Sequence, residues 1–186
     1  METETSLAAD DDALMAAYQG GDQDAFGLLY ERYAPMLRRI LRRGGLGDEE
    51  TSDLVQESFL HLHRARADYR SGGGLRPWLV TIALNLKREH LRRRGRRPEA
   101  ALDERAEERA GVAAHDAAAA DRSRAVHAAL QELPEGQRQV IVLHWFEEFS
   151  FPEISRILGV GLSATKVRAH RGYGRLREWL EHRGHR

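Results

Sequence analysis

The chain has 186 residues, of which 41% are hydrophobic and 31% are charged, and its formal net charge is zero. This composition indicates a soluble globular protein of one or two small domains. Cysteine is absent, which excludes disulfides, thiolate metal sites and cysteine nucleophiles. No apolar run approaches the length of a membrane span and the N-terminus is acidic, so we expect a cytoplasmic protein that does not insert into a membrane.

The charges are distributed unevenly along the chain. Residues 1–27 carry seven acids and no Lys or Arg, and residues 98–121 carry seven acids and two arginines. Residues 70–97 carry nine Lys or Arg and one acid, and residues 156–186 carry eight and two. Two basic blocks separated by an acidic spacer are typical of a protein that holds a polyanion at two places. Solvated helix faces would give the same pattern, and charge alone does not separate the two interpretations.

Nearly every segment has a helical period, and alternating β-branched runs do not occur, so we predict an all-α fold. A short first helix is expected over residues 10–19, where two glycines end it. A second helix, capped by Asp22 or Asp24, is expected to reach about Arg43. Pro35 lies inside this helix and should kink or interrupt it.

A third helix is expected over about 48–67, with three acids at its start that suit the helix dipole. Its spacing predicts a buried face made of Leu54, Val55, Ser58, Phe59 and Leu62. A glycine-rich loop at 71–74 follows it.

The next helix should begin at Pro77 and end in a run of arginines. One face, expected to be buried, consists of Leu75, Leu79, Ile82 and Leu86, and a different face consists of Trp78, Thr81, Asn85 and Arg88. The second face is aromatic, polar and cationic. An aromatic ring can stack on a base, an Asn can hydrogen-bond a base edge, and an Arg can hold a phosphate. The alternative is a core tryptophan beside a solvated basic helix end.

From about residue 96 to residue 121 the chain is dominated by Ala, Glu, Asp and Arg, which favours a flexible linker between two domains. The second domain should then start near Arg122. Its first helix is expected to end at Leu133, and Pro134 to start a further helix that reaches Trp145.

The strongest local pattern is a helix-turn-helix. Ser150 and Glu153 form a capping box, a short helix follows, Gly159 ends it, and a final helix runs from about Leu162 to Leu180. The final helix carries Lys166, Arg168, His170, Arg171 and Arg175. Cations in its N-terminal half suit insertion into the DNA major groove. An ordinary helical hairpin with a solvated basic face is the alternative.

Together these segments resemble the sigma-70 family of bacterial transcription initiation factors, specifically the two-domain extracytoplasmic-function (ECF) group. The resemblance rests on the order of four blocks, which are Asp53–Leu60, Arg76–Asn85, Leu133–Arg138 and Phe151–Val160. It implies a domain over 1–97 that binds polymerase and opens the −10 element, a linker over 98–121, and a helix-turn-helix domain over 122–186 that recognises the −35 element.

The resemblance also implies roles for individual residues. Docking on the polymerase β′ subunit falls to Asp53, Gln56 and Glu57. Opening of the −10 element, with capture of non-template bases, falls to Trp78, Asn85, Arg88 and the loop 71–74. Phosphate contacts fall to Arg92, Arg93, Arg94, Arg96 and Arg97, and −35 recognition to Lys166, Arg168, His170 and Arg171. The implied partners are core RNA polymerase through its β′ and β subunits, promoter DNA and an anti-sigma factor.

Three residues depart from the family pattern. Gly161 stands where the family usually has Ser, so Ser163 would have to cap a helix that starts later. Gly172 and Gly174 lie inside the recognition helix, where each costs up to about 1 kcal/mol relative to Ala. Either they allow close backbone approach, or the helix frays beyond His170.

Two other classes of function fit the sequence less well. A stand-alone helix-turn-helix regulator would leave the Asp53–Leu60 and Trp78–Asn85 blocks without a role. A nuclease or metal-dependent hydrolase would need a ligand set, but His61 and His63 are two residues apart and point in different directions on a helix. We therefore expect no catalytic activity, no cofactor and no metal.

Overall fold

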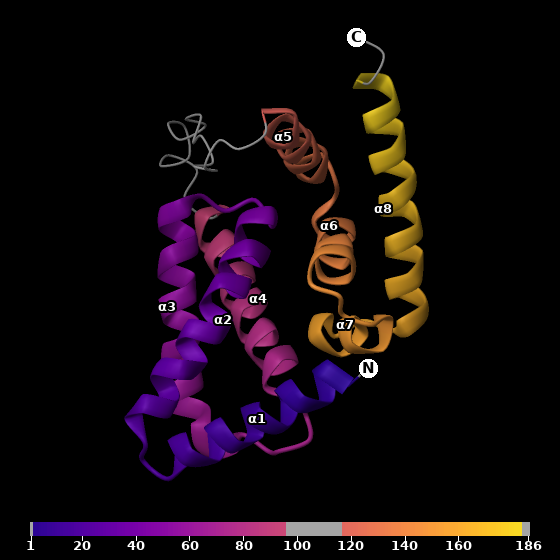
Figure 1. Ribbon diagram of the computed structural model, residues 1–186. Helices are drawn as coiled ribbons and strands as arrows, with labels where there is room; N and C mark the ends of the chain where they lie inside the picture. Colours follow the sequence, from indigo (N-terminus) through magenta and orange to yellow (C-terminus); the bar gives the residue numbers. More distant parts are fainter. Residues whose placement is uncertain (1, 96–116, 184–186) are drawn as a thin grey trace. The chain divides into compact units, whose positions relative to one another are not determined.

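The computed structural model describes the backbone of residues 2–95 and 117–183, and the side chains of residues 11–95 and 123–182. Within these ranges every regular element is helical, as predicted (Figure 1). The chain forms two compact units, one built mainly from helices α1 to α4 and the other from α5 to α8. Over the same ranges each helix is too short or too polar to span a lipid bilayer.

The first unit begins with α1 (Glu2–Gln19) and α2 (Gln23–Arg43). Helix α1 ends where the sequence predicted but starts eight residues earlier, at Glu2. Asp22 rather than Asp24 caps α2, because its Oδ1 accepts the backbone N–H groups of Asp24 at 2.9 Å and Ala25 at 3.3 Å.

Of the two effects expected of Pro35, a kink or an interruption, the interruption does not occur, because α2 continues through the proline. Pro35 lies on the exposed side of α2, whereas its neighbours Ala34 and Met36 are buried. The carbonyl of Glu31, which Pro35 leaves without its helical donor, belongs to an exposed residue and can be hydrated. Burial on both sides of the proline therefore keeps the two halves of the helix together.

Helix α3 (Asp48–Ala65) continues into a short 3-10 turn (Arg66–Asp68) and packs side by side with α4 (Leu75–Gly95), as Figure 1 shows. The predicted inward face of α3 is confirmed, since all five of its residues are buried: Leu54, Val55, Ser58, Phe59 and Leu62.

Helix α4 differs from its prediction in two ways. It begins at Leu75, so Pro77 lies in the first turn but is not the first helical residue. Its buried face consists of Leu75, Leu79, Val80, Ala83, Leu84 and Lys87. Ile82 and Leu86, which were expected to be buried, are only half-buried. Since apolar residues surround much of this helix, the periodicity left its inward direction open, and contact with α3 decides it.

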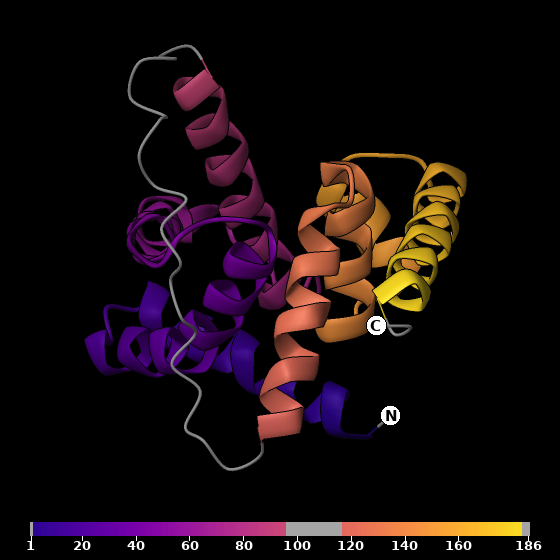
Figure 2. The ribbon, with the colours of Figure 1, turned by 90° about the horizontal axis from the view of Figure 1, so that it is seen from above.

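The second unit begins with α5 (Ala117–Gln131) and α6 (Glu135–Ile141), and α6 runs on into a π-helical segment (Val142–Phe146). Helices α7 (Phe151–Leu158) and α8 (Leu162–Arg183) follow. Helix α5 starts inside the segment expected to be a linker, so residues 117–121 are helical. The rest of that segment, 98–116, lies outside the described residues. Helix α8, drawn in yellow in Figure 2, packs against α5, α6 and α7.

Candidate nucleic-acid interface

Helix α3 presents a polar surface opposite its buried face. Asp53, Gln56 and Glu57 are all exposed, and their spacing places them on one side of the helix. Leu60 extends this side by one turn and is 45% exposed. The sequence pattern gave Leu60 no role, although an exposed leucine beside three polar residues is suited to a protein contact.

On α4 the predicted aromatic and polar face is only partly free. Trp78 is half-buried, and its ring lies 5.5 Å from the ring of Tyr69 at an angle of 44°. Thr81 donates its hydroxyl to the carbonyl of Pro77 at 2.8 Å, so this donor is used within the helix. Asn85 and Arg88 are exposed and joined by a hydrogen bond, with Arg88 Nη1 donating to Asn85 Oδ1 at 3.1 Å.

The arginines at the end of α4 pair with acids inside the first unit. Arg92 and Arg93 contact Glu89 at 2.6 and 3.1 Å, and Arg94 pairs with Glu50. Hydrogen bonds from Arg92 and Arg93 hold the pKa of Glu89 below its usual value. Water screens exposed pairs of this kind, so they contribute little to stability and a phosphate can replace the carboxylate. Arg96 and Arg97 lie outside the described residues.

Hydrogen bonds fix both ends of α7 and the turn that follows it. The capping box is confirmed, with Glu153 N–H donating to Ser150 Oγ at 3.4 Å and Ser150 N–H donating to Glu153 Oε2 at 2.8 Å. Gly159 ends α7 in the left-handed conformation, with φ of 64°. Beyond it, Ser155 Oγ donates to the carbonyl of Val160 at 2.6 Å. These contacts fix the direction in which the chain enters α8.

Helix α8 starts at Leu162, which differs from the later start that a Ser163 cap would need. The carbonyl of Gly161 accepts both the N–H of Thr165 at 3.0 Å and its hydroxyl at 3.1 Å. Thr165 is buried, so the first turn of α8 is held by this residue.

The predicted −35 residues do not all share one side of α8. Lys166, His170 and Arg171 are exposed on the same side, together with Val167, which is 47% exposed. Arg168 is half-buried and lies over α6, where a Cβ added to Gly136 would come within 3.4 Å of its Nη1. The structure thus brings three of the four residues together and places Arg168 at the edge of that surface.

The two glycines of α8 have different surroundings. A Cβ on Gly172 would lie 3.0 Å from Cγ1 of Ile141 on α6, whereas a Cβ on Gly174 would meet no atom within 4 Å. The helix continues to Arg183, so it does not fray beyond His170. Close approach of the two helices therefore accounts for Gly172.

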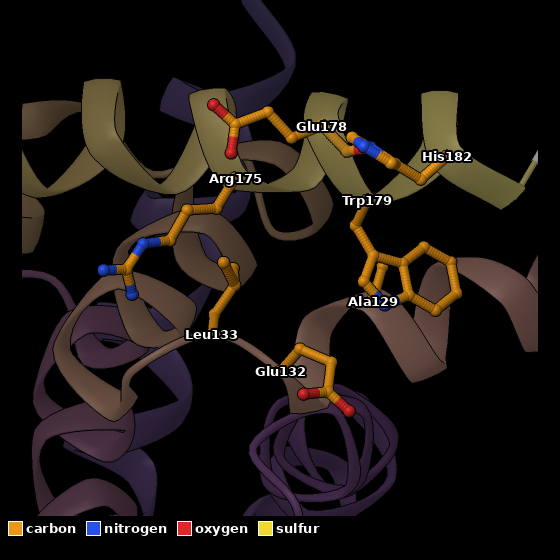
Figure 3. Close-up of a pocket in the computed structure, with 7 residues that line it drawn as sticks. All are labelled: Ala129, Glu132, Leu133, Arg175, Glu178, Trp179 and His182. Atoms are coloured by element: carbon orange, nitrogen blue, oxygen red, sulfur yellow. The ribbon is translucent and has the colours of Figure 1, made fainter.

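The C-terminal half of α8 borders a groove of about 530 Å³ on the side of α5 (Figure 3). Its lining residues are Ala129, Glu132, Leu133, Arg175, Glu178, Trp179 and His182. Figure 3 shows the indole of Trp179 extending from α8 toward α5. Arg175 lines this groove and is exposed, one helical turn beyond Arg171.

In the described residues, His, Asp and Glu side chains nowhere gather in a group of three or more that could hold a metal ion. The exposed polar and basic side chains of α3, α4 and α8 are instead suited to contacts with protein and nucleic acid.

Comparisons with known proteins give matches over both units. Residues 29–97 match the family Sigma-70 region 2, and residues 123–176 match Sigma-70, region 4. RNA polymerase sigma factor CarQ of Myxococcus xanthus is 38% identical over 170 residues, which cover 89% of this chain and 95% of CarQ. ECF RNA polymerase sigma factor SigM of Mycobacterium tuberculosis is 31% identical over 170 residues, covering 91% of this chain and 84% of SigM.

Two solved structures are similar along most of the chain. CnrH in complex with the cytosolic domain of CnrY has a TM-score of 0.71 and 29% identity, covering 92% of this chain and 97% of CnrH. The sigma factor RpoE in complex with the anti-sigma factor NepR, from Bartonella quintana, has a TM-score of 0.71 and 25% identity, covering 84% of this chain and 96% of RpoE. With both family regions present in order, and relatives matched over nearly their whole length, this chain belongs to the sigma-70 family of RNA polymerase sigma factors, in the ECF group.

Proposed function

We propose that this chain binds core RNA polymerase and directs initiation through two separate promoter contacts. Residues 1–97 would dock on the polymerase and open the −10 element, residues 122–186 would recognise the −35 element, and residues 98–121 would link them. The observation that carries this proposal is that both family regions present exposed basic or polar faces at the positions of their motifs. Promoter choice and strand opening belong to this chain, and RNA synthesis belongs to the polymerase.

The −10 contact would use Trp78, Asn85, Arg88 and the loop 71–74. Extruding a base costs a few kcal/mol, about as much as one base gains by stacking on an aromatic ring, roughly 1–3 kcal/mol. Trp78 is supported on one side by Tyr69, and Asn85 and Arg88 are exposed for polar contacts with the released strand. Arg92, Arg93 and Arg94, with Arg96 and Arg97, would hold the phosphate backbone without selecting sequence.

The −35 contact would use the N-terminal half of α8 in the major groove. Lys166, His170 and Arg171 would meet base edges, and Arg168 would act from the edge of this surface. An arginine that pairs bidentately with a guanine contributes about 1–3 kcal/mol of discrimination.

Two protein partners are proposed, core RNA polymerase and an anti-sigma factor. The β′ subunit of the polymerase would dock on the α3 side formed by Asp53, Gln56 and Glu57, with Leu60 adding an apolar contact. The β subunit would complete the complex. The similar structures contain CnrH with CnrY and RpoE with the anti-sigma factor NepR, which supports control of this chain by an anti-sigma factor.

Transcription by purified core RNA polymerase mixed with this chain, on a library of random promoter sequences, tests the function. Transcripts that depend on the chain and share a two-part promoter are expected. If the folded chain neither binds the polymerase nor changes the transcripts, the assignment fails. A stand-alone DNA-binding regulator would bind duplex DNA in the same preparation without polymerase.

A further inference from the structure

The acidic N-terminal helix has no part in the contacts proposed above, yet two adjacent aspartates of α1 have distinct and well-defined partners. Asp11 is 4% exposed and binds α2, where it accepts Arg32 Nη1 at 2.7 Å and the hydroxyl of Tyr33. Asp11 therefore joins two helices of the first unit.

Asp12 is half-buried and faces the turn that precedes α4. Its Oδ1 accepts the hydroxyl of Tyr69 at 2.5 Å, and its Oδ2 accepts the backbone N–H of Gly72 at 3.2 Å. One carboxylate thus holds the side chain at the start of the Tyr69–Gly74 turn and a backbone group in its middle. Burial, followed by the hydrogen bond to Asp12, raises the pKa of Tyr69 well above its ordinary value.

The glycines of the turn held by Asp12 can adopt many conformations. The turn contains three consecutive glycines, and Gly72 and Gly74 have φ angles of 86° and 79°. Glycine loses more conformational freedom on ordering than any other residue. A turn of this composition needs an anchor outside itself if it is to be ordered before DNA arrives.

The contacts of Asp12 extend through Tyr69 to Trp78, the residue proposed above to stack on a base. Tyr69, held through its hydroxyl by Asp12, is the aromatic ring that lies 5.5 Å from Trp78. The same carboxylate therefore fixes both the glycine turn and the ring that supports Trp78.

We propose that Asp12 is a positioning residue for −10 strand capture, which holds the Tyr69–Gly74 turn in the conformation that receives a non-template base. The inference rests on the proposed role of the 71–74 loop and Trp78. Without Asp12 the turn must be ordered when the base binds, so capture is weakened. Loss of two hydrogen bonds to a partly exposed carboxylate should reduce open-complex formation about tenfold.

Holoenzyme reconstituted from core polymerase and the full chain provides the test, with open complexes measured by permanganate reactivity of unpaired thymines. The promoter is used intact and with an abasic nucleotide at each non-template −10 position in turn. Asp12→Ala should lose about tenfold on the intact promoter and less than about twofold once the captured base is absent, because both changes remove the same interaction.

Three further variants separate positioning from folding. Asp12→Asn should stay within about twofold of the wild type, because its amide oxygen can accept Gly72 N–H while its NH2 donates to the Tyr69 hydroxyl. Tyr69→Phe removes one hydroxyl and gives the same test if Asp12→Ala does not fold. Asp11→Ala is the matched control, which should lower the melting temperature while keeping the wild-type ratio between intact and abasic promoters.

An equal loss by Asp12→Ala on intact and abasic promoters, or no loss on either, would overturn the inference. So would an Asp12→Asn variant as defective as Asp12→Ala, since geometry would then not be what matters. If wild-type holoenzyme opens no promoter, the proposed function fails instead, and the two failures remain distinct.

Discussion

The substitution Gly172→Ala tests whether α8 is held at a fixed distance from α6. The added Cβ would lie 3.0 Å from Cγ1 and 3.3 Å from Cδ1 of Ile141, and 3.5 Å from Cβ of Gln137. Ile141 is 2% exposed, and its Cγ1 is attached directly to the branched Cβ, so it cannot rotate away without displacing other buried atoms.

Two opposing effects set the magnitude. Replacing glycine by alanine inside a helix stabilises by about 1 kcal/mol, whereas overfilling a close-packed interface costs about 1–3 kcal/mol. Because the nearest atom is a constrained branch carbon, the second effect should win, and we expect a net loss of about 1 kcal/mol. Gly174→Ala meets no atom within 4 Å and should instead gain about 0.5–1 kcal/mol.

Urea unfolding followed by tryptophan fluorescence measures both variants. Trp145 and Trp179 lie in the second unit, so a Trp78→Phe background restricts the signal to that unit. A double-mutant cycle with Ile141→Ala should show Gly172→Ala costing less once the opposing side chain is removed. A Gly172→Ala variant as stable as Gly174→Ala, or an unchanged cost in the Ile141→Ala background, would refute the reasoning.

Four further outcomes are expected. Trp78→Ala combined with Asn85→Ala should lower open-complex formation about tenfold while polymerase affinity stays within about twofold, and equal losses of both would make this face part of the core. Arg171→Ala should weaken transcription more on promoters with a strong −35 element than on promoters without one, whereas equal weakening would indicate a backbone contact. Ser150→Ala should cost about 1 kcal/mol in urea unfolding through loss of the helix cap. Tyr173→Phe removes a buried hydroxyl that has no hydrogen-bond partner among the described residues, so it should be neutral or stabilise by up to about 1 kcal/mol. Burial raises the pKa of Tyr173 from 10.0 to about 12. Between these pH values the tyrosine loses its proton in the unfolded chain but keeps it in the folded chain, so the wild type should lose stability as the pH rises. The Phe variant has no such group and should lose less.

Local patterns predicted most of the fold. The inward face of α3 follows from apolar positions that recur three and four residues apart. Ser150, Glu153 and Gly159 mark the ends of α7 through contacts and backbone geometry within a few residues. The fold class and the position of the helix-turn-helix could be predicted from the sequence because capping and helical periodicity are local effects.

The misplaced features depend on contacts distant in sequence. The inward side of α4 differs from the prediction at Ile82 and Leu86 because contacts with other helices, mainly α3, select among several apolar faces. The interruption at Pro35 did not occur because burial on both sides outweighs the lost hydrogen bond. The position of Arg168 over Gly136 could not be predicted either, because the two residues are far apart in the sequence, and its −35 role stays a prediction.

The inward and outward sides of α8 tolerate substitution to different degrees. Its inward side is fixed by Thr165 and by the contact between Gly172 and Ile141, where few other side chains fit. Its outward side, which includes Lys166 and His170, is exposed, and substitutions at such positions usually change stability by less than about 0.5 kcal/mol. After gene duplication, selection can therefore rewrite the outward side of one helix and redirect a copy to new genes while its scaffold stays folded.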